Sequence, residues 1–294
     1  MASEQPSRST ITTGRITPFH FLRQKQQRGR IAMVTAYDSP SAVLAETAGI
    51  DGILVGDSAA MTMLGLDSTV QITVDEMLLL TRAVSRSVRR PLVVADMPFG
   101  SFQVSDEEAV RHAVRLVKEG GAGAVKLEGA GPTITRVRAI VGVGIPVMGH
   151  VGLTPQSAVA LGGYRVQGRR ARDAQRLFDE AVALQHAGCF AVVLEAMPAV
   201  VAARISEALD IPTIGIGAGR ECDGQILVWH DLLGLTPGHV PQFVKRYAEL
   251  GAAAKDALAA YVNDVRTRAF PEPKHTYEMA EGEAELFAAT KLKP

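Results

Sequence analysis

Short apolar runs alternate with longer amphipathic segments along most of the chain. Each run is apolar at consecutive positions, which is typical of strands that are buried on both faces of a parallel sheet. The eight runs cover residues 31–37, 53–57, 92–96, 124–128, 146–150, 191–195, 212–216 and 224–229. Helix-start signals lie between them, such as Thr73 with Glu76 and Ser105 before three acidic residues. The pattern therefore predicts an α/β fold with eight strands.

Eight strands that alternate with helices predict a (β/α)8 barrel, or TIM barrel. We expect residues 15–268 to form this catalytic domain, 1–14 to be a flexible N-terminal tail and 269–294 to be a C-terminal extension. The segment that follows Thr17 and Pro18 predicts a short capping helix at the bottom of the barrel. A doubly wound sheet is the alternative, but it calls for an early glycine-rich phosphate turn, and no G-x-G-x-x-G motif follows an early strand.

Three segments do not follow the simple alternation. Residues 59–69 are rich in Met and Gly and predict a loop, and residues 151–168 predict an unusually long loop after the fifth strand. Residues 244–266 predict a helical region after the last strand. Long loops at the C-terminal ends of barrel strands commonly carry binding residues.

Composition and charge exclude several classes of function. The chain has 31 basic and 31 acidic side chains and no dense basic stripe, so nothing indicates a nucleic-acid partner. No apolar run approaches the roughly 18 residues of a membrane span, and the N-terminus lacks the apolar core of a secretory signal. The two cysteines, Cys189 and Cys222, have no disulfide or zinc-site spacing. These features predict a cytoplasmic protein with no membrane partner.

Four of the predicted strands end in an acid. These acids are Asp57, Asp96, Glu128 and Glu195. The C-terminal ends of barrel strands line the reaction site, so we expect the four carboxylates to converge there. A buried carboxylate is costly unless a cation neutralises it, and oxygen-only ligation favours Mg²⁺. The sequence therefore predicts a magnesium site.

Other residues near these acids complete a candidate site. Lys126 lies two residues before Glu128, so the two side chains share a face of the strand, and the ammonium can hold a substrate carboxylate or oxyanion. Ser58 can offer a hydroxyl to the same anion, and Glu195 is the candidate general base. Purely structural interpretations remain open. Asp57 alone is as typical of a turn or helix cap as of an active site, and His150 is as typical of a structural histidine as of a substrate contact.

Several long motifs resemble the ketopantoate hydroxymethyltransferase family, over residues 15–268. They are Val34–Asp38, Leu54–Ser58, Ala95–Ser101, Ala124–Gly129, Met148–Gln156, Leu194–Glu195 and Thr213–Gly219. The resemblance implies a Mg²⁺-dependent (β/α)8 enzyme. It transfers a one-carbon unit from 5,10-methylenetetrahydrofolate to 3-methyl-2-oxobutanoate, giving 2-dehydropantoate in pantothenate biosynthesis. It also implies a homo-oligomer, commonly a decamer.

Carried over motif by motif, the resemblance assigns roles to the acids and their neighbours. It implies that Asp57, Asp96 and Glu128 are associated with the metal and that Glu195 is the proton acceptor. The keto acid would contact Asp57, Ser58, Asp96 and Lys126. Two alternatives remain open at this point. One is another Mg²⁺-dependent, enolate-forming barrel of the isocitrate lyase and phosphoenolpyruvate mutase kind, and the other is a catalytically silent barrel used as a scaffold.

Overall fold

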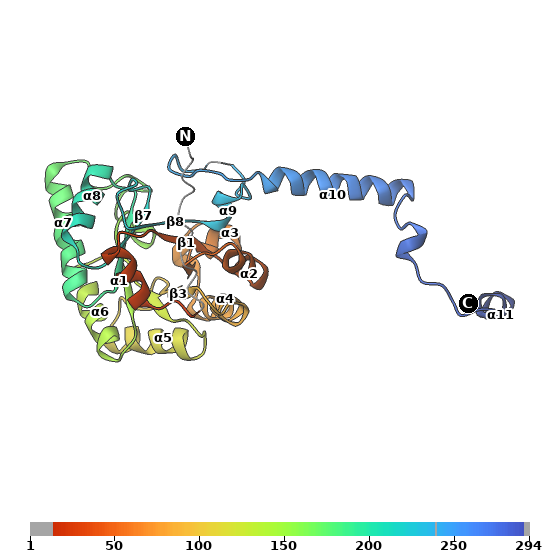
Figure 1. Cartoon of the computed structure of the whole chain (residues 1–294), viewed down its shortest axis with the longest axis horizontal. Helices are drawn as coiled ribbons and strands as arrows, with labels where there is room; N and C mark the ends of the chain where they lie inside the picture. The colour runs from red at the N-terminus through yellow and green to blue at the C-terminus, as the bar shows by residue number, and fades with distance from the viewer. Residues whose placement is uncertain (1–13, 239, 291–294) are drawn as a thin grey trace, which may run out of the picture.

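The computed structural model describes residues 14–238 and 240–290, and its core is a closed barrel (Figure 1). Eight parallel strands follow one another around the barrel in chain order, and the last pairs with the first. The strands are β1 (Ile31–Thr35), β2 (Gly52–Val55), β3 (Leu92–Asp96), β4 (Ala124–Lys126), β5 (Val147–Gly152), β6 (Ala191–Glu195), β7 (Thr213–Ile216) and β8 (Gly224–Leu227). The predicted (β/α)8 barrel is confirmed.

Six helices that connect successive strands cover the outside of the barrel. They are α2 (Ser39–Thr47), α4 (Val74–Ser87), α5 (Asp106–Lys118), α6 (Thr133–Gly142), α7 (Ala171–His186) and α8 (Ala199–Ala208). Local chemistry fixes where they begin: the Asp38 carboxylate accepts a hydrogen bond from the Ser41 amide, and Thr73 with Glu76 forms the expected capping box. Residues 217–223, by contrast, connect β7 to β8 without a helix.

The N-terminal end of the barrel is closed by α1 (Pro18–Gln26), as the sequence predicts. Its Phe21 is buried and meets Phe190 edge to face, with ring centroids 6.0 Å apart. Gly52 at the start of β2 makes room for this helix, because a Cβ there would lie 2.9 Å from the Phe21 ring. The C-terminal end of the barrel is consequently the open one.

The loops at the open end are more ordered than the sequence predicts. The expected loop 59–69 contains a helical turn, α3 (Ala59–Thr62), and the 3₁₀ turn η1 (Thr69–Gln71) follows it. Because the Ala60 amide bonds to the Asp57 carbonyl, β2 ends early and Asp57 lies in the turn into α3. The connection after β5 contains a second 3₁₀ turn, η2 (Pro155–Ser157).

The segment after β8 departs from the barrel pattern. One helical turn, α9 (Trp229–Leu232), follows β8, and α10 (Leu250–Thr267) then runs away from the barrel toward η3 (Pro273–His275) and α11 (Glu283–Ala289) (Figure 1). The expected helix over 244–266 is wrong for its first turn. Residues up to 249 fold back on α9 instead, where the Tyr247 amide donates to the Leu232 carbonyl over 2.8 Å.

The two ends of the chain complete the description. Of the expected tail 1–14, all but Gly14 lies outside the described residues. Across 14–238 and 240–290, no helix combines the length and the apolar character that crossing a bilayer requires.

Candidate active site

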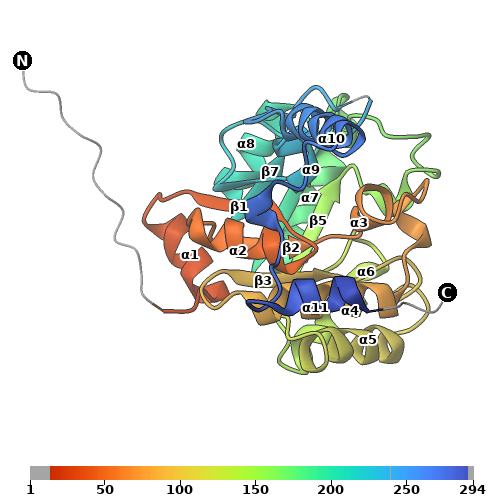
Figure 2. The same ribbon diagram turned by 90° about the vertical axis from the view of Figure 1, so that its right-hand side faces the viewer.

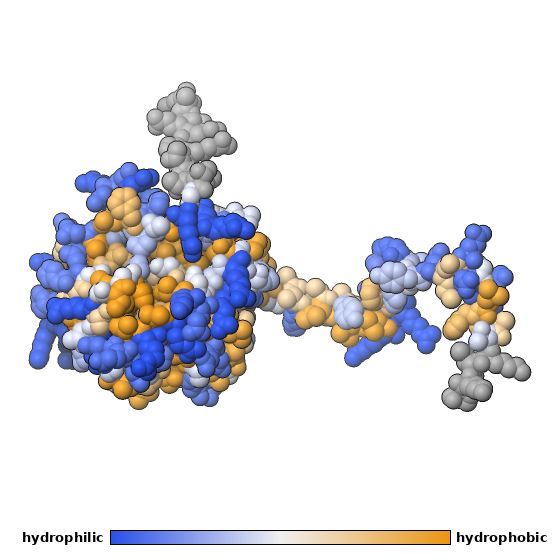
Figure 3. All heavy atoms as spheres, turned by 90° about the horizontal axis from the view of Figure 1, so that it is seen from below, coloured by the Kyte–Doolittle hydropathy of each residue, from blue (hydrophilic) through white to orange (hydrophobic). Residues whose placement is uncertain are grey.

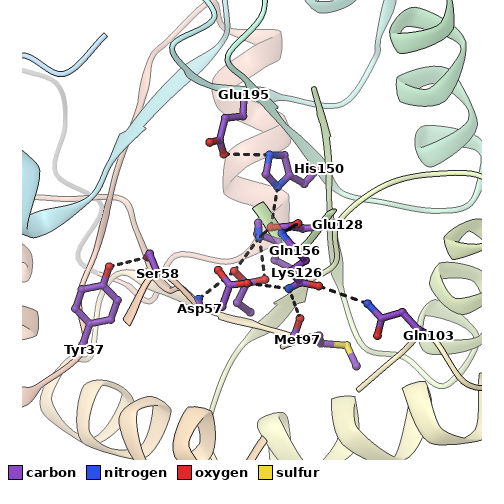
Figure 4. Close-up of polar contacts among 11 residues, drawn as sticks. Tyr37, Asp57, Ser58, Met97, Gln103, Lys126, Glu128, His150, Gln156 and Glu195 are labelled. Atoms are coloured by element: carbon purple, nitrogen blue, oxygen red, sulfur yellow. Dashed lines mark hydrogen bonds and ion pairs between the residues drawn. The ribbon is translucent and has the colours of Figure 1, made fainter. Parts of the chain in front are cut away.

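Three acids and one lysine meet at the open end of the barrel. Lys126, the last residue of β4, donates to both carboxylate oxygens of Asp96, the last residue of β3, over 2.8 Å. The same ammonium lies 3.5 Å from Glu128, and the Asp57 amide donates to Asp96 over 3.3 Å. All four side chains are buried. The structure thus brings together the acids predicted from three separate strand ends (Figure 4).

The charge of this cluster is unbalanced, because three carboxylates face one ammonium. Burial, followed by the charges of Asp96 and Glu128, raises the pKa of Asp57 well above its ordinary value. Burial opposes the charge on Lys126, but the charges of the three acids outweigh it and raise the lysine pKa. For Glu128, burial favours the neutral form, yet Lys126 and further hydrogen bonds lower its pKa. The cluster therefore favours an additional cation.

A divalent cation would stabilise the carboxylates that the single ammonium leaves unbalanced. Within the described part of the chain, no three His, Cys, Asp or Glu side chains are arranged to hold a metal by themselves. Mg²⁺ does not need such a set, since it commonly takes one or two carboxylates and fills its other positions with water and substrate oxygens. The donor set at Asp57, Asp96 and Glu128 therefore fits Mg²⁺ in its chemistry.

Gln156 ties the cluster together, and sequence reasoning missed it. Its side-chain amide donates to Asp57 and to the Met97 carbonyl, both over 2.9 Å, while its backbone amide donates to Glu128 over 2.9 Å (Figure 4). Gln156 lies on η2, so the long connection after β5 is anchored directly on two of the acids. The one available signal was its place at the end of the Met148–Gln156 motif.

His150 joins the predicted base Glu195 to the acid cluster. Its Nε2 lies 3.2 Å from Glu195 and its Nδ1 3.6 Å from Glu128, although neither nitrogen has an aligned hydrogen-bond partner. Burial would lower the pKa of His150, but its contacts with the two glutamates raise it to about 9. Next to Glu195, Ala196 adopts a left-handed backbone with φ of 46°, which is uncommon for a side chain with a Cβ. Glu195 consequently ends β6 at a sharp turn beside the cluster.

Ser58 lies at the edge of the cluster and is held from β1. The buried Tyr37, just beyond the end of β1, shares a 2.8 Å hydrogen bond with the Ser58 hydroxyl (Figure 4). Sequence reasoning named Tyr37 only as part of a motif. The structure shows that it fixes the orientation of a predicted substrate contact.

Solved structures with the same fold include enzymes that act on small acids. Phosphonopyruvate hydrolase in complex with oxalate and Mg²⁺ matches with a TM-score of 0.58 at 14% identity, covering 93% of this chain and 95% of that chain. 2,3-Dimethylmalate lyase, a member of the phosphoenolpyruvate mutase and isocitrate lyase superfamily, matches with a TM-score of 0.55 at 16% identity, covering 92% and 93%. At such identities the likeness establishes the fold alone.

Sequence relatives are far more similar. The 3-methyl-2-oxobutanoate hydroxymethyltransferase of Carboxydothermus hydrogenoformans is 54% identical over 266 residues, covering 90% of this chain and 96% of the relative. The enzyme of that name from Moorella thermoacetica is 55% identical over 264 residues, covering 90% and 98%. The family model for ketopantoate hydroxymethyltransferase matches residues 15–273. The chain therefore belongs to the ketopantoate hydroxymethyltransferase family.

Proposed function

We propose that this protein transfers a hydroxymethyl group from 5,10-methylenetetrahydrofolate to 3-methyl-2-oxobutanoate, giving 2-dehydropantoate. The observation that carries the proposal is the cluster of Asp57, Asp96, Glu128 and Lys126 beside Glu195, in a chain of this family. Its excess of carboxylates over the single lysine suits a divalent cation, to which a 2-oxo acid can bind. The fold neighbours of the isocitrate lyase kind are only 14–18% identical, so they do not favour the lyase alternative.

Asp57, Asp96 and Glu128 would be associated with Mg²⁺, one or two of them as direct ligands and the remainder through water. Bound there, the ion would polarise the keto group of the 2-oxo acid and acidify the proton on C3. Lys126 holds Asp96 in place and gives the substrate carboxylate a positive partner, which is the usual pairing for such an anion. The Ser58 hydroxyl, fixed by Tyr37, donates to the same substrate.

Glu195 takes the C3 proton and so forms the enolate. It is suited to this role because it lies on the strand beside β5, and its side chain is 15% exposed, which leaves it accessible to a substrate. His150 lies between Glu195 and Glu128, where its ring contacts both carboxylates and positions the base beside the acid cluster. The enolate carbon then forms a bond to the one-carbon unit, and the overall reaction consumes one water because the product carries a hydroxyl.

Turnover with the two substrates tests this function. Purified protein with Mg²⁺, 3-methyl-2-oxobutanoate and 5,10-methylenetetrahydrofolate should form 2-dehydropantoate and tetrahydrofolate in equal amounts, measured by NMR. Removing the metal with EDTA should abolish product, and adding Mg²⁺ should restore it. Cleavage of a 2-oxo or 2-hydroxy acid without any need for folate would contradict the proposal and favour a lyase.

The protein also acts as a homo-oligomer in this proposal, and α10 supports this. Its apolar residues Leu258, Tyr261, Val262 and Val265 recur at intervals of one helical turn, and all are exposed (Figure 3). An exposed apolar stripe of this kind normally packs against a partner. The decameric size rests on the family resemblance.

Light scattering tests the assembly. The pair Leu258→Asp and Val262→Asp should shift the full chain to a smaller species, whereas Ala260→Asp on the opposite face of α10 should not. A monomeric parent protein, or identical masses for all variants, would contradict the assembly.

In this proposal, residues 15–268 form the catalytic domain and residues 269–294 form a C-terminal extension. The proposal also includes a cytoplasmic location, which is supported by two buried cysteines that form no disulfide.

A further inference from the structure

Two loops from opposite sides of the barrel meet above the acid cluster. α3 belongs to the connection after β2, and Tyr164 belongs to the connection after β5. The Tyr164 hydroxyl donates to the sulfur of Met61 over 3.8 Å, which joins the two loops. Figure 2 shows α3 at the same side of the barrel as the long loop that follows β5. This contact brings the two loops together at the open end of the barrel.

The surface of these loops is apolar and open to solvent. We define the apolar rim as Met61, Met63, Leu64 and Tyr164, whose side chains are between 41% and 56% exposed. Soluble proteins rarely group apolar side chains on the surface unless something binds there. Methionine and tyrosine together suit a flat aromatic ligand, since a thioether adapts its shape and both groups pack well against rings.

Tyr164 also lies within the electrostatic reach of the candidate active site. Partial burial, followed by the charges of Asp57, Glu128 and Glu195, raises the pKa of its hydroxyl. Together with its contact to Met61, three residues after Ser58, this places Tyr164 near the candidate active site. A ring that packs on Tyr164 would therefore be held close to the reacting groups.

Exposed arginines follow the apolar rim on the same loop. Arg165, Arg169 and Arg170 are exposed, and none forms a salt bridge with any side chain in residues 14–238 or 240–290. Unpaired arginines that follow an apolar surface on the same loop suit a ligand that combines an aromatic body with carboxylates. The single lysine of the acid cluster, Lys126, is buried and serves the keto acid in the proposed function, so a second anionic ligand needs its own positive partners.

We infer that the apolar rim binds the pterin and aryl rings of the folate co-substrate, and that Arg165, Arg169 and Arg170 bind the carboxylates of its glutamate tail. This inference rests on the proposed function. A folate has the required combination of flat rings and a dicarboxylate. Its reactive carbon lies between the two ring systems, so rings packed on Tyr164 would bring that carbon over the keto acid.

A cavity elsewhere in the fold offers a control for the proposed folate site. It has a volume of about 700 Å³ and also contains arginines and an aromatic ring, namely Arg30, Arg220 and Phe243. It extends from Ala196 and Gly217, which follow β6 and β7, to Ile31 and Gly224, which lie at the N-terminal ends of their strands. Arg220 in its lining has a side chain that is 95% exposed and pairs with Glu221, and it serves as the control arginine.

Steady-state kinetics with Tyr164→Ala, Tyr164→Phe and the triple variant Arg165→Ala/Arg169→Ala/Arg170→Ala test the inference. Tyr164→Ala should raise the KM for 5,10-methylenetetrahydrofolate about three- to tenfold, the effect of one lost aromatic contact, and Tyr164→Phe should restore most of it. The triple variant should lose the preference for the folate over the corresponding tetrahydropteroate, which lacks glutamate. Arg220→Ala should keep the parent KM for both compounds.

Deuterium exchange at C3 of 3-methyl-2-oxobutanoate, which uses no folate, reports separately on the keto acid site. Retained exchange with an increased folate KM supports the inference and shows that the variants fold. An unchanged folate KM in both Tyr164→Ala and the triple arginine variant overturns the inference while the proposed function stands. An increase in the folate KM that is confined to Arg220→Ala does the same. If the parent protein shows no folate-dependent turnover at all, the proposed function fails, and the inference fails with it.

Discussion

Replacing Gln156 with methionine should weaken Mg²⁺ binding and lower the stability of the metal-free protein. The variant keeps the length of the side chain and the backbone amide that donates to Glu128, but it removes the hydrogen bonds to Asp57 and Met97, both 2.9 Å long. A hydrogen bond to a charged group contributes about 1.5–3 kcal/mol and one to a neutral carbonyl about 1 kcal/mol. We therefore expect a decrease in the free energy of unfolding of about 3 kcal/mol.

The effect on metal binding follows from the proton on Asp57. The bond from Gln156 lowers the pKa of Asp57 against the opposing effects of burial and like charge, so its loss raises that pKa further. Mg²⁺ must then compete with a proton for the carboxylate. Loss of a residue that orients a metal ligand typically weakens binding about 10–100-fold, and mildly alkaline buffer should restore part of it.

Calorimetric titration of metal-free protein with MgCl₂, at neutral and at mildly alkaline pH, measures this affinity, and urea unfolding measures the stability. Gln175→Met is the matched control, since Gln175 donates to Asp179 over the same 2.9 Å, but on an exposed helix surface. The control should leave both quantities unchanged. An unchanged Mg²⁺ affinity in Gln156→Met would refute the role of Gln156, and an equal loss at both pH values would refute the competition with a proton.

Three further outcomes follow from the same cluster and its surroundings. Burial, then the charges of Asp96 and Glu128, raises the folded pKa of Asp57 above its ordinary 3.8, so the metal-free protein should lose stability as pH rises from 3.8 through that folded pKa. Urea unfolding across this range should show a flatter profile for Asp57→Asn, and parallel profiles would contradict the assignment. Lys126→Met should lower the free energy of unfolding of the metal-free protein by about 3–5 kcal/mol, because it leaves buried carboxylates unpaired. A decrease below about 1 kcal/mol, which is typical of a surface ion pair, would contradict that prediction. Burial raises the pKa of Cys189 to about 12, so a thiol reagent should modify it only after unfolding, and rapid labelling of the folded protein would be inconsistent with its burial.

The barrel and its acids were predictable because the signals are local. A buried parallel strand is apolar at every position, and a capping box such as Thr73 with Glu76 is complete within four residues. The acids were recognisable because charges at the ends of such strands need an explanation. Closing the barrel then places Asp57, Asp96 and Glu128 together, although they come from three different strands.

Gln156 was not predictable in the same way. It is a neutral residue in a loop, and its bond to Asp57 joins positions 99 residues apart. Nothing in its neighbourhood along the sequence indicates that contact. Likewise, the periodicity of α10 predicts a helix with an apolar stripe, but it does not tell which surface the stripe packs against. The first turn of that helix was mispredicted because backbone bonds to α9 compete with it.

The proposed chemistry requires that a metal held by buried acids makes the C3 proton of a 2-oxo acid available to Glu195. Its most direct test is NMR measurement of deuterium exchange at C3 of 3-methyl-2-oxobutanoate, without folate, for the parent protein and for Glu195→Gln. We expect Mg²⁺-dependent exchange by the parent and none by Glu195→Gln, with calorimetry showing that the variant still binds Mg²⁺. Undiminished exchange by Glu195→Gln, or exchange by the parent that persists in EDTA, would contradict the claim.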